Sequence, residues 1–204
     1  MKCTSLQKLE LSACESLKTF PEIIGEMKYI TRINLIATSI EKVPISFQNL
    51  TGLIQLDIKG NGMLRLPSSI VSMPNLSVRF SGCIFPKLED KLSFMVTTSP
   101  KSRTHISLTK CNLSDEYLPI VITWSANLKM LNLSGHNFTI LPECIKDYRF
   151  LFHLRLDDCK FLREIRGIPP NLEYLSAIRC NSLTSSCKNM LLNQVLCFYS
   201  LCLT

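Results

Sequence analysis

The side chains best suited to chemistry in this sequence are three histidines and ten cysteines. Imidazole and thiolate groups bind zinc, and they also act as bases and nucleophiles. Their spacing does not fit those roles, because there is no C-x-x-C, H-E-x-x-H, G-x-S-x-G, G-x-G-x-x-G or P-loop pattern. We therefore predict a protein that is not an enzyme and that carries no cofactor and no metal ion.

The placement of these residues follows a repeat that is clearest between Leu128 and Cys159. LKMLNLSGH begins at Leu128 and LFHLRLDDC begins at Leu151, and both read L-x-x-L-x-L-x-x-(polar or Cys). Recurrence of this pattern every 20 to 29 residues is typical of a leucine-rich repeat. The other units, which bring the total to about eight, begin near Leu6, Ile30, Leu53, Asn75, Arg103 and Leu172.

Each unit predicts a short strand followed by a return segment. Positions four and six are apolar, as in Leu131 and Leu133, so one face of the strand is buried. An apolar–proline pair such as Leu141-Pro142 recurs after the strand, and proline suits an irregular segment because it has no N–H to donate. We therefore predict an α/β leucine-rich-repeat solenoid, with a parallel β-sheet on the concave face and loops and short helices on the convex face.

The repeats define one solenoid domain over residues 1–185, with an irregular insertion at about residues 84–104. The insertion lacks the repeat pattern and ends in a Ser/Pro/Lys/Arg cluster, which is typical of a solvated loop, although a functional inserted loop is the alternative. Residues 186–204 form an apolar tail that we do not expect to be a separate domain. The tail would either cap the open end of the solenoid or promote aggregation.

Position nine of the repeat is its one inward-facing polar slot, where side chains bond backbone groups of the turn. A free cysteine is small and readily buried, so it can serve there without a disulfide. His105 and His153 occupy position three, two strands apart, and a separation of roughly 9 to 10 Å is too large for them to share a metal ion. In the eight units, position nine is Cys14, Thr38, Asn61, Cys83, Cys111, His136, Cys159 and Cys180.

The remaining candidates for function are the solvent-facing side chains of the strands. In the N-terminal half these are ordinary, and Asp57 and Arg79, at position five of adjacent strands, predict an ion pair. In the C-terminal half they are aromatic residues, methionine and arginine, which are enriched at protein interfaces. The alternative is that Phe152 and Tyr174 cover each other or face a neighbouring domain. The predicted protein-binding surface consists of Met130, Phe152, His153, Arg155, Tyr174 and Arg179.

Charge and targeting signals restrict the partners. The net charge is +7, but the basic residues are scattered and do not alternate with aromatics, so we expect no nucleic-acid partner. The start of the chain is already in repeat register without a signal peptide, and no apolar run approaches the roughly 20 residues that span a bilayer. We therefore expect a cytoplasmic protein with no membrane partner. Five N-x-[ST] sequons leave one alternative, an extracellular leucine-rich-repeat ligand-binding domain of a receptor-like protein.

Three runs, CNLSDEYLP, LNLSGHNFTILPECIK and LDDCKFLREIRGIPPNLEYLSAIRCNSLTSS, resemble the leucine-rich repeats of plant TIR–nucleotide-binding–LRR disease-resistance proteins. The resemblance extends to about Gln194, and His136 stands where the family usually has asparagine. It implies a fragment of an intracellular immune receptor, cytoplasmic with nuclear entry also open. Such a region senses a pathogen effector or a guarded host protein, and it restrains the nucleotide-binding and TIR domains of the same receptor class. The sequence has no TIR domain and no P-loop, so the activities of those domains do not carry over.

Overall fold

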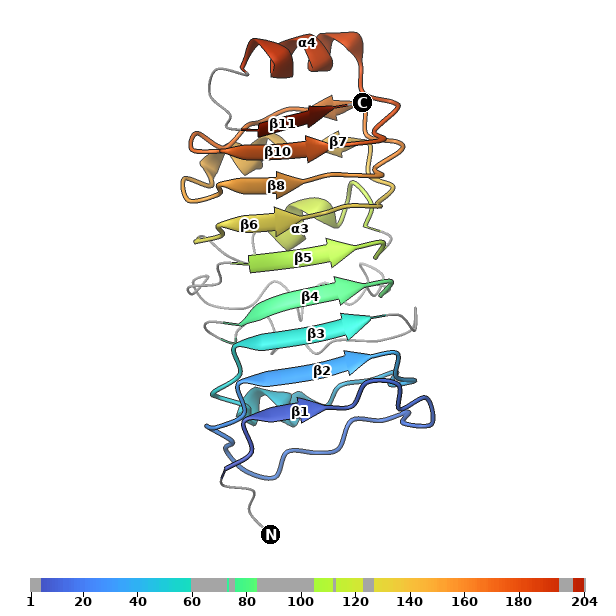
Figure 1. Ribbon diagram of the computed structural model, residues 1–204, viewed down its shortest axis with the longest axis vertical. Coiled ribbons are helices and arrows are strands. Elements are labelled where there is room, and N and C mark those ends of the chain that lie inside the picture. The colour runs from blue at the N-terminus through green and yellow to red at the C-terminus, as the bar shows by residue number, and fades with distance from the viewer. Residues whose placement is uncertain are drawn as a thin grey trace.

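One parallel sheet dominates the computed structural model, which describes residues 5–59, 73, 76–83, 105–111, 113–122, 127–194 and 200–203. Within these residues nine strands pair in the order β1-β2-β3-β4-β5-β6-β8-β10-β11, and every pair is parallel (Figure 1). The strands are β1 (Lys8–Glu10), β2 (Arg32–Ile36), β3 (Gln55–Lys59), β4 (Ser77–Ser81), β5 (His105–Thr109), β6 (Met130–Asn132), β8 (His153–Arg155), β10 (Tyr174–Ala177) and β11 (Ser200–Leu203).

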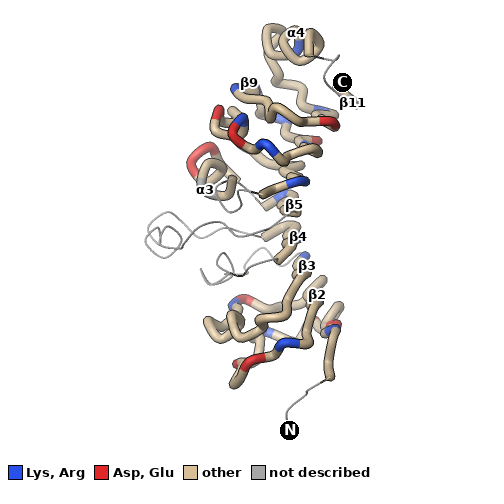
Figure 2. Tube along the Cα trace, turned by 90° about the vertical axis from the view of Figure 1, so that its left-hand side faces the viewer, with Lys and Arg blue, Asp and Glu red and all other residues tan. Residues whose placement is uncertain are grey.

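The return segments hold short helices and a small second sheet, and Figure 2 shows α3 on the side opposite the strands. Two of these short helices, η1 and η3, follow a predicted apolar–proline pair, and Pro44 and Pro142 are their N-cap residues. The predicted α/β solenoid, with its sheet on one face and short helices on the other, is confirmed. These elements are η1 (Ile45–Asn49), α3 (Leu118–Ile122), β7 (Ile140–Leu141), η3 (Glu143–Asp147), β9 (Glu164–Ile165) and α4 (Ser185–Asn193).

The core lies between the sheet and the return segments. Position-four side chains of neighbouring strands stack in register, as in the row Leu131, Leu154 and Leu175. None of these three side chains is more than 2% exposed. Burying a leucine side chain contributes roughly 1.5–3 kcal/mol, so the stacked rows provide the main stabilisation of the solenoid.

Position nine forms a second ladder, which joins consecutive units through hydrogen bonds. His136 Nε2 lies 3.0 Å from the carbonyl oxygen of Leu108, which is position six of the preceding unit. The Cys159 thiol donates in the same way to the Leu133 carbonyl, at 3.1 Å. The same bond runs from Cys180 to Leu156 and from Cys111 to Phe80.

This ladder confirms the structural role predicted for position nine in the units that contain these residues. The first unit differs, because Cys14 is exposed. Its strand β1 is the edge strand among the described residues, so no described unit packs against its turn on that side. Asn61 and the predicted insertion at residues 84–104 lie outside the described residues.

The C-terminal residues add two elements that were not predicted from the sequence. Helix α4 is capped by the Thr184 side chain, which accepts a hydrogen bond from the Cys187 N–H, and it buries Leu191 completely. Strand β11 then continues the sheet beyond β10, with Leu201 opposite Leu175. The predicted boundary at residues 185 and 186 falls in the first turn of α4. In the described part of the chain, no helix is long and apolar enough to cross a membrane.

Candidate protein-binding site

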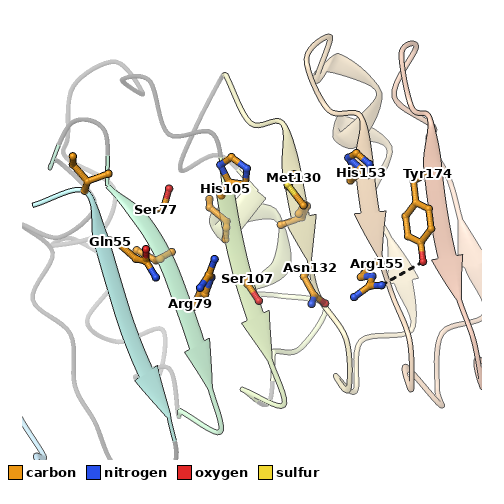
Figure 3. Close-up of a pocket in the computed structure, with 14 residues that line it drawn as sticks. Gln55, Ser77, Arg79, His105, Ser107, Met130, Asn132, His153, Arg155 and Tyr174 are labelled. Carbon is orange, nitrogen blue, oxygen red and sulfur yellow. Dashed lines mark hydrogen bonds between the residues drawn. The ribbon is translucent and has the colours of Figure 1, made fainter. Parts of the chain in front are cut away.

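A groove with a volume of about 630 Å³ runs across the concave face of the sheet (Figure 3). Because side chains alternate along a strand, positions three and five of each unit face away from the core. Position three contributes a row from β3 to β10 that consists of Gln55, Ser77, His105, Met130, His153 and Tyr174. Position five contributes a second row of Arg79, Ser107, Asn132 and Arg155.

At one end of the groove, Tyr174 contacts two neighbours on β8. Its ring lies 5.8 Å from the His153 ring, centroid to centroid, and the Arg155 guanidinium carbon lies 5.6 Å from the centre of the Tyr174 ring. Arg155 Nη2 donates a hydrogen bond of 3.5 Å to the tyrosine hydroxyl, and this bond raises the pKa of Arg155 above its usual value. Arg155 is therefore a permanent cation in cation–π contact with the Tyr174 ring.

At the other end, Arg79 forms the predicted ion pair with Asp57, with 3.9 Å between Nη1 and Oδ1. The Asp57 side chain is 15% exposed, and Gln55 Nε2 donates to its Oδ2 at 2.6 Å. The Arg79 side chain is 67% exposed, so its cation extends from the largely buried Asp57 carboxylate into the groove. An ion pair this exposed contributes less than about 1 kcal/mol to stability.

His105 lies near the middle of the groove. Partial burial is the largest cause that lowers the pKa of His105. The positive charges of Arg79 and Lys129 lower it further, and His153 makes a smaller contribution in the same direction. The Arg79 and Lys129 side chains are thus the cations closest in effect to His105. His105 and His153 are separated by strand β6, as predicted, and no cluster of three or more His, Cys, Asp or Glu among the described residues could hold a metal ion.

The structure brings together four of the six residues predicted to form a binding surface. Met130, His153, Arg155 and Tyr174 all line the groove. Phe152 lies immediately before β8, is half-buried and is not among the lining residues.

Arg179 also lies apart from the groove. Its backbone φ is +60°, in the turn that follows β10, and its guanidinium binds the Asp158 carboxylate of the preceding unit at 2.5 and 2.7 Å. The same left-handed conformation recurs at position eight of the other described units, so Arg179 belongs to the turn and not to the strand surface. The ion pair between Arg179 and Asp158 joins two consecutive units and is a structural contact.

Sequence reasoning omitted the N-terminal part of the groove. Arg79 and His105 were not in the predicted set, although each occupies the same repeat position as a residue that was. Both residues could have been predicted by taking positions three and five of every strand as the solvent-facing surface. The groove presents arginine, histidine, amide and hydroxyl donors with one methionine and one tyrosine, and this set can bind a polypeptide.

Comparison with known proteins places these repeats in a family. The model for the leucine-rich repeats of RPS4B-like disease resistance proteins matches residues 3–202. A probable disease resistance protein of Arabidopsis thaliana is 34% identical over 89% of this chain and 11% of its own length. The TMV resistance protein N of Nicotiana glutinosa is 29% identical, and the match covers 84% of this chain and 19% of that protein.

A third relative, disease resistance-like protein DSC1 of Arabidopsis thaliana, is 32% identical over 90% of this chain and 13% of its own length. The chain thus spans between about a tenth and a fifth of the length of these relatives. The resemblance predicted from the sequence is confirmed by both the family model and the relatives. The chain belongs to the RPS4B-like leucine-rich repeats of plant disease resistance proteins.

Proposed function

We propose that this chain is the non-catalytic protein-interaction region of a plant intracellular immune receptor. Its concave groove contacts its protein partners, which are a pathogen effector or a guarded host protein and the nucleotide-binding and TIR domains of the same receptor class, and the region restrains those domains. The observation that carries the proposal is the groove itself, in which Tyr174 and Arg155 stand on rigid strands of a disease-resistance repeat array. Tyrosine and arginine are among the residues that most often dominate binding energy at protein interfaces.

The positions of two of the five sequon asparagines support this intracellular function over an extracellular receptor domain. Asn49 Nδ2, the atom that would carry a glycan, donates to the Ile23 carbonyl oxygen at 2.8 Å. Asn132 lines the groove, so a glycan on its Nδ2 would occupy the proposed binding surface. Thiols that donate to backbone carbonyls, as at Cys159 and Cys180, also suit a reducing compartment such as the cytoplasm.

Co-precipitation in plant cells under reducing conditions tests the proposal. The chain is expressed with the TIR–nucleotide-binding portion of a relative, and both the recovered partner and the signalling output of that portion are measured. We expect recovery of the partner and a reduced output with the unmodified chain. Arg155→Gln and Tyr174→Ala should each lower recovery by about tenfold, which is a typical hot-spot effect.

Arg149→Gln provides a matched control, because Arg149 is exposed in the loop before β8 and does not line the groove. It makes the same chemical change as Arg155→Gln and should leave recovery unchanged. Equal recovery with all the variants, or no recovery with the unmodified chain, would refute the proposed function. A mobility shift on endoglycosidase treatment would favour the extracellular alternative.

A further inference from the structure

We propose that the concave groove binds an acidic polypeptide segment in an extended conformation, with its carboxylates held by Arg79 and Arg155. This inference rests on the proposed protein-binding role of the groove and adds the chemistry of the partner. Its first support is the charge of the lining. The described residues that line the groove include two arginines and two histidines but no aspartate and no glutamate.

Both arginines keep donors directed toward a ligand. The carboxylate partner of Arg79 lies on its buried side, because the Asp57 side chain is 15% exposed and the Arg79 side chain 67% exposed. Arg79 Nη1 and Asp57 Oδ1 are 3.9 Å apart. The Arg155 guanidinium carbon lies 5.6 Å from the centre of the Tyr174 ring, and the group makes a single long bond of 3.5 Å to the tyrosine hydroxyl. A guanidinium group has five N–H donors in a planar fork that fits a carboxylate, so each arginine can bind one more acid.

The space between the arginines also favours a polypeptide. Arg79 on β4 and Arg155 on β8 stand at position five, and β5 and β6 lie between them. Three strand spacings make their separation roughly 14 Å, which an extended peptide covers with about four residues. Ser107 and Asn132 occupy position five between them and offer polar contacts to a peptide backbone, while Met130 beside them offers an apolar one.

A nucleic acid fits this row less well. Its backbone carries a negative charge at every nucleotide, whereas the position-five row has cations only at its two ends. A peptide with two acidic side chains about four residues apart matches both cations and leaves its middle residues against neutral side chains.

Fluorescence anisotropy with the whole chain tests this assignment. The probe is a labelled seven-residue peptide with glutamate at its second and sixth positions and serine elsewhere, and the control probe has glutamine at both positions. We expect the glutamate probe to bind at least about tenfold more tightly, because each charge-assisted bond is worth one to two powers of ten in affinity. Arg79→Gln and Arg155→Gln should each lower that affinity by about tenfold.

Four controls make the result decisive. Arg149→Gln should bind the glutamate probe as the unmodified chain does, and thermal unfolding should show that every variant is folded. Arg155→Lys should bind between the unmodified chain and Arg155→Gln, because lysine keeps the charge but not the fork. A single-stranded oligothymidine of similar length tests the phosphate alternative.

Equal affinity for the glutamate and glutamine probes would overturn the inference. So would oligothymidine that binds more tightly than the acidic probe and depends on the same arginines. If the acidic probe fails while Arg155→Gln still abolishes co-precipitation of the receptor partner, the acidic chemistry is wrong and the groove keeps its proposed function. If the probe binds as expected but co-precipitation is insensitive to Arg155, the inference stands and the proposed function fails.

Discussion

His136 should make the folded chain acid-sensitive, and replacing it with asparagine should remove that part of the sensitivity. The ring is 1% exposed, and its two nitrogens have different partners. Nδ1 accepts the Leu113 N–H at 3.1 Å, while Nε2 lies 3.0 Å from the Leu108 carbonyl oxygen. The neutral tautomer with its proton on Nε2 satisfies both bonds, whereas protonation of Nδ1 would direct an N–H at the N–H of Leu113.

Burial lowers the pKa of His136 from 6.5 to about 4. The unfolded chain therefore binds more protons than the folded chain between these values, so stability is fully present above pH 6.5 and falls as the pH drops toward 4. One unit of pKa corresponds to about 1.4 kcal/mol, so the complete loss is about 3 kcal/mol, of which about 2 kcal/mol is lost by pH 5.

The assay is urea unfolding of the unmodified chain and of His136→Asn at pH 7 and pH 5. Asparagine can bond the turn but does not titrate, so carboxylates and the other histidines contribute equally in both proteins. We expect the unmodified chain to lose about 2 kcal/mol more than the variant over this pH interval. Equal losses in the two proteins would refute the argument that His136 is held neutral.

Two further predictions concern the core and the thiols. Leu131→Ala should lower the free energy of unfolding by about 2–5 kcal/mol, because the side chain is 2% exposed in the stacked row; a loss below about 1 kcal/mol in urea unfolding would contradict that packing. Under native conditions Cys14, which is exposed, should react with iodoacetamide well before Cys180. Cys180 is buried, and the neighbouring Cys159 thiol and burial both raise its pKa, so a small thiolate fraction slows alkylation. Mass spectrometry of the labelled peptides checks the order, and faster labelling of Cys180 would contradict the ladder.

The repeat pattern predicted the parts of the fold in which each residue has the same environment in every unit. Leu131 and Cys159 were assigned correctly because strand alternation and the inward turn determine which side chains are buried. Arg179 was placed incorrectly because its direction depends on the left-handed turn at position eight and on the Asp158 carboxylate, neither of which hydrophobic periodicity reports.

The full extent of the groove and the C-terminal elements α4 and β11 were not predicted from the sequence. Arg79 and His105 lie on adjacent strands and belong to the same surface as Met130. Residues 84–104, whose sequence lacks the repeat pattern, separate Arg79 from His105 in the chain, so this surface was not recognised as continuous. Leu201 and Leu203 of strand β11 fit positions four and six of the repeat, but these residues were interpreted as an apolar tail. The strand joins the sheet because the edge of β10 offers unpaired backbone groups and Leu201 can cover Leu175.

Carbethoxylation of histidines with diethyl pyrocarbonate gives the most direct test of the concave groove as the protein-binding site. His105 and His153 line the groove, whereas His136 is buried and serves as an internal reference. When the chain is bound to the TIR–nucleotide-binding portion of a relative, we expect modification of both groove histidines to slow several-fold, with His136 unreactive in either state. Unchanged labelling of His105 and His153 in a complex shown to be intact would contradict the account.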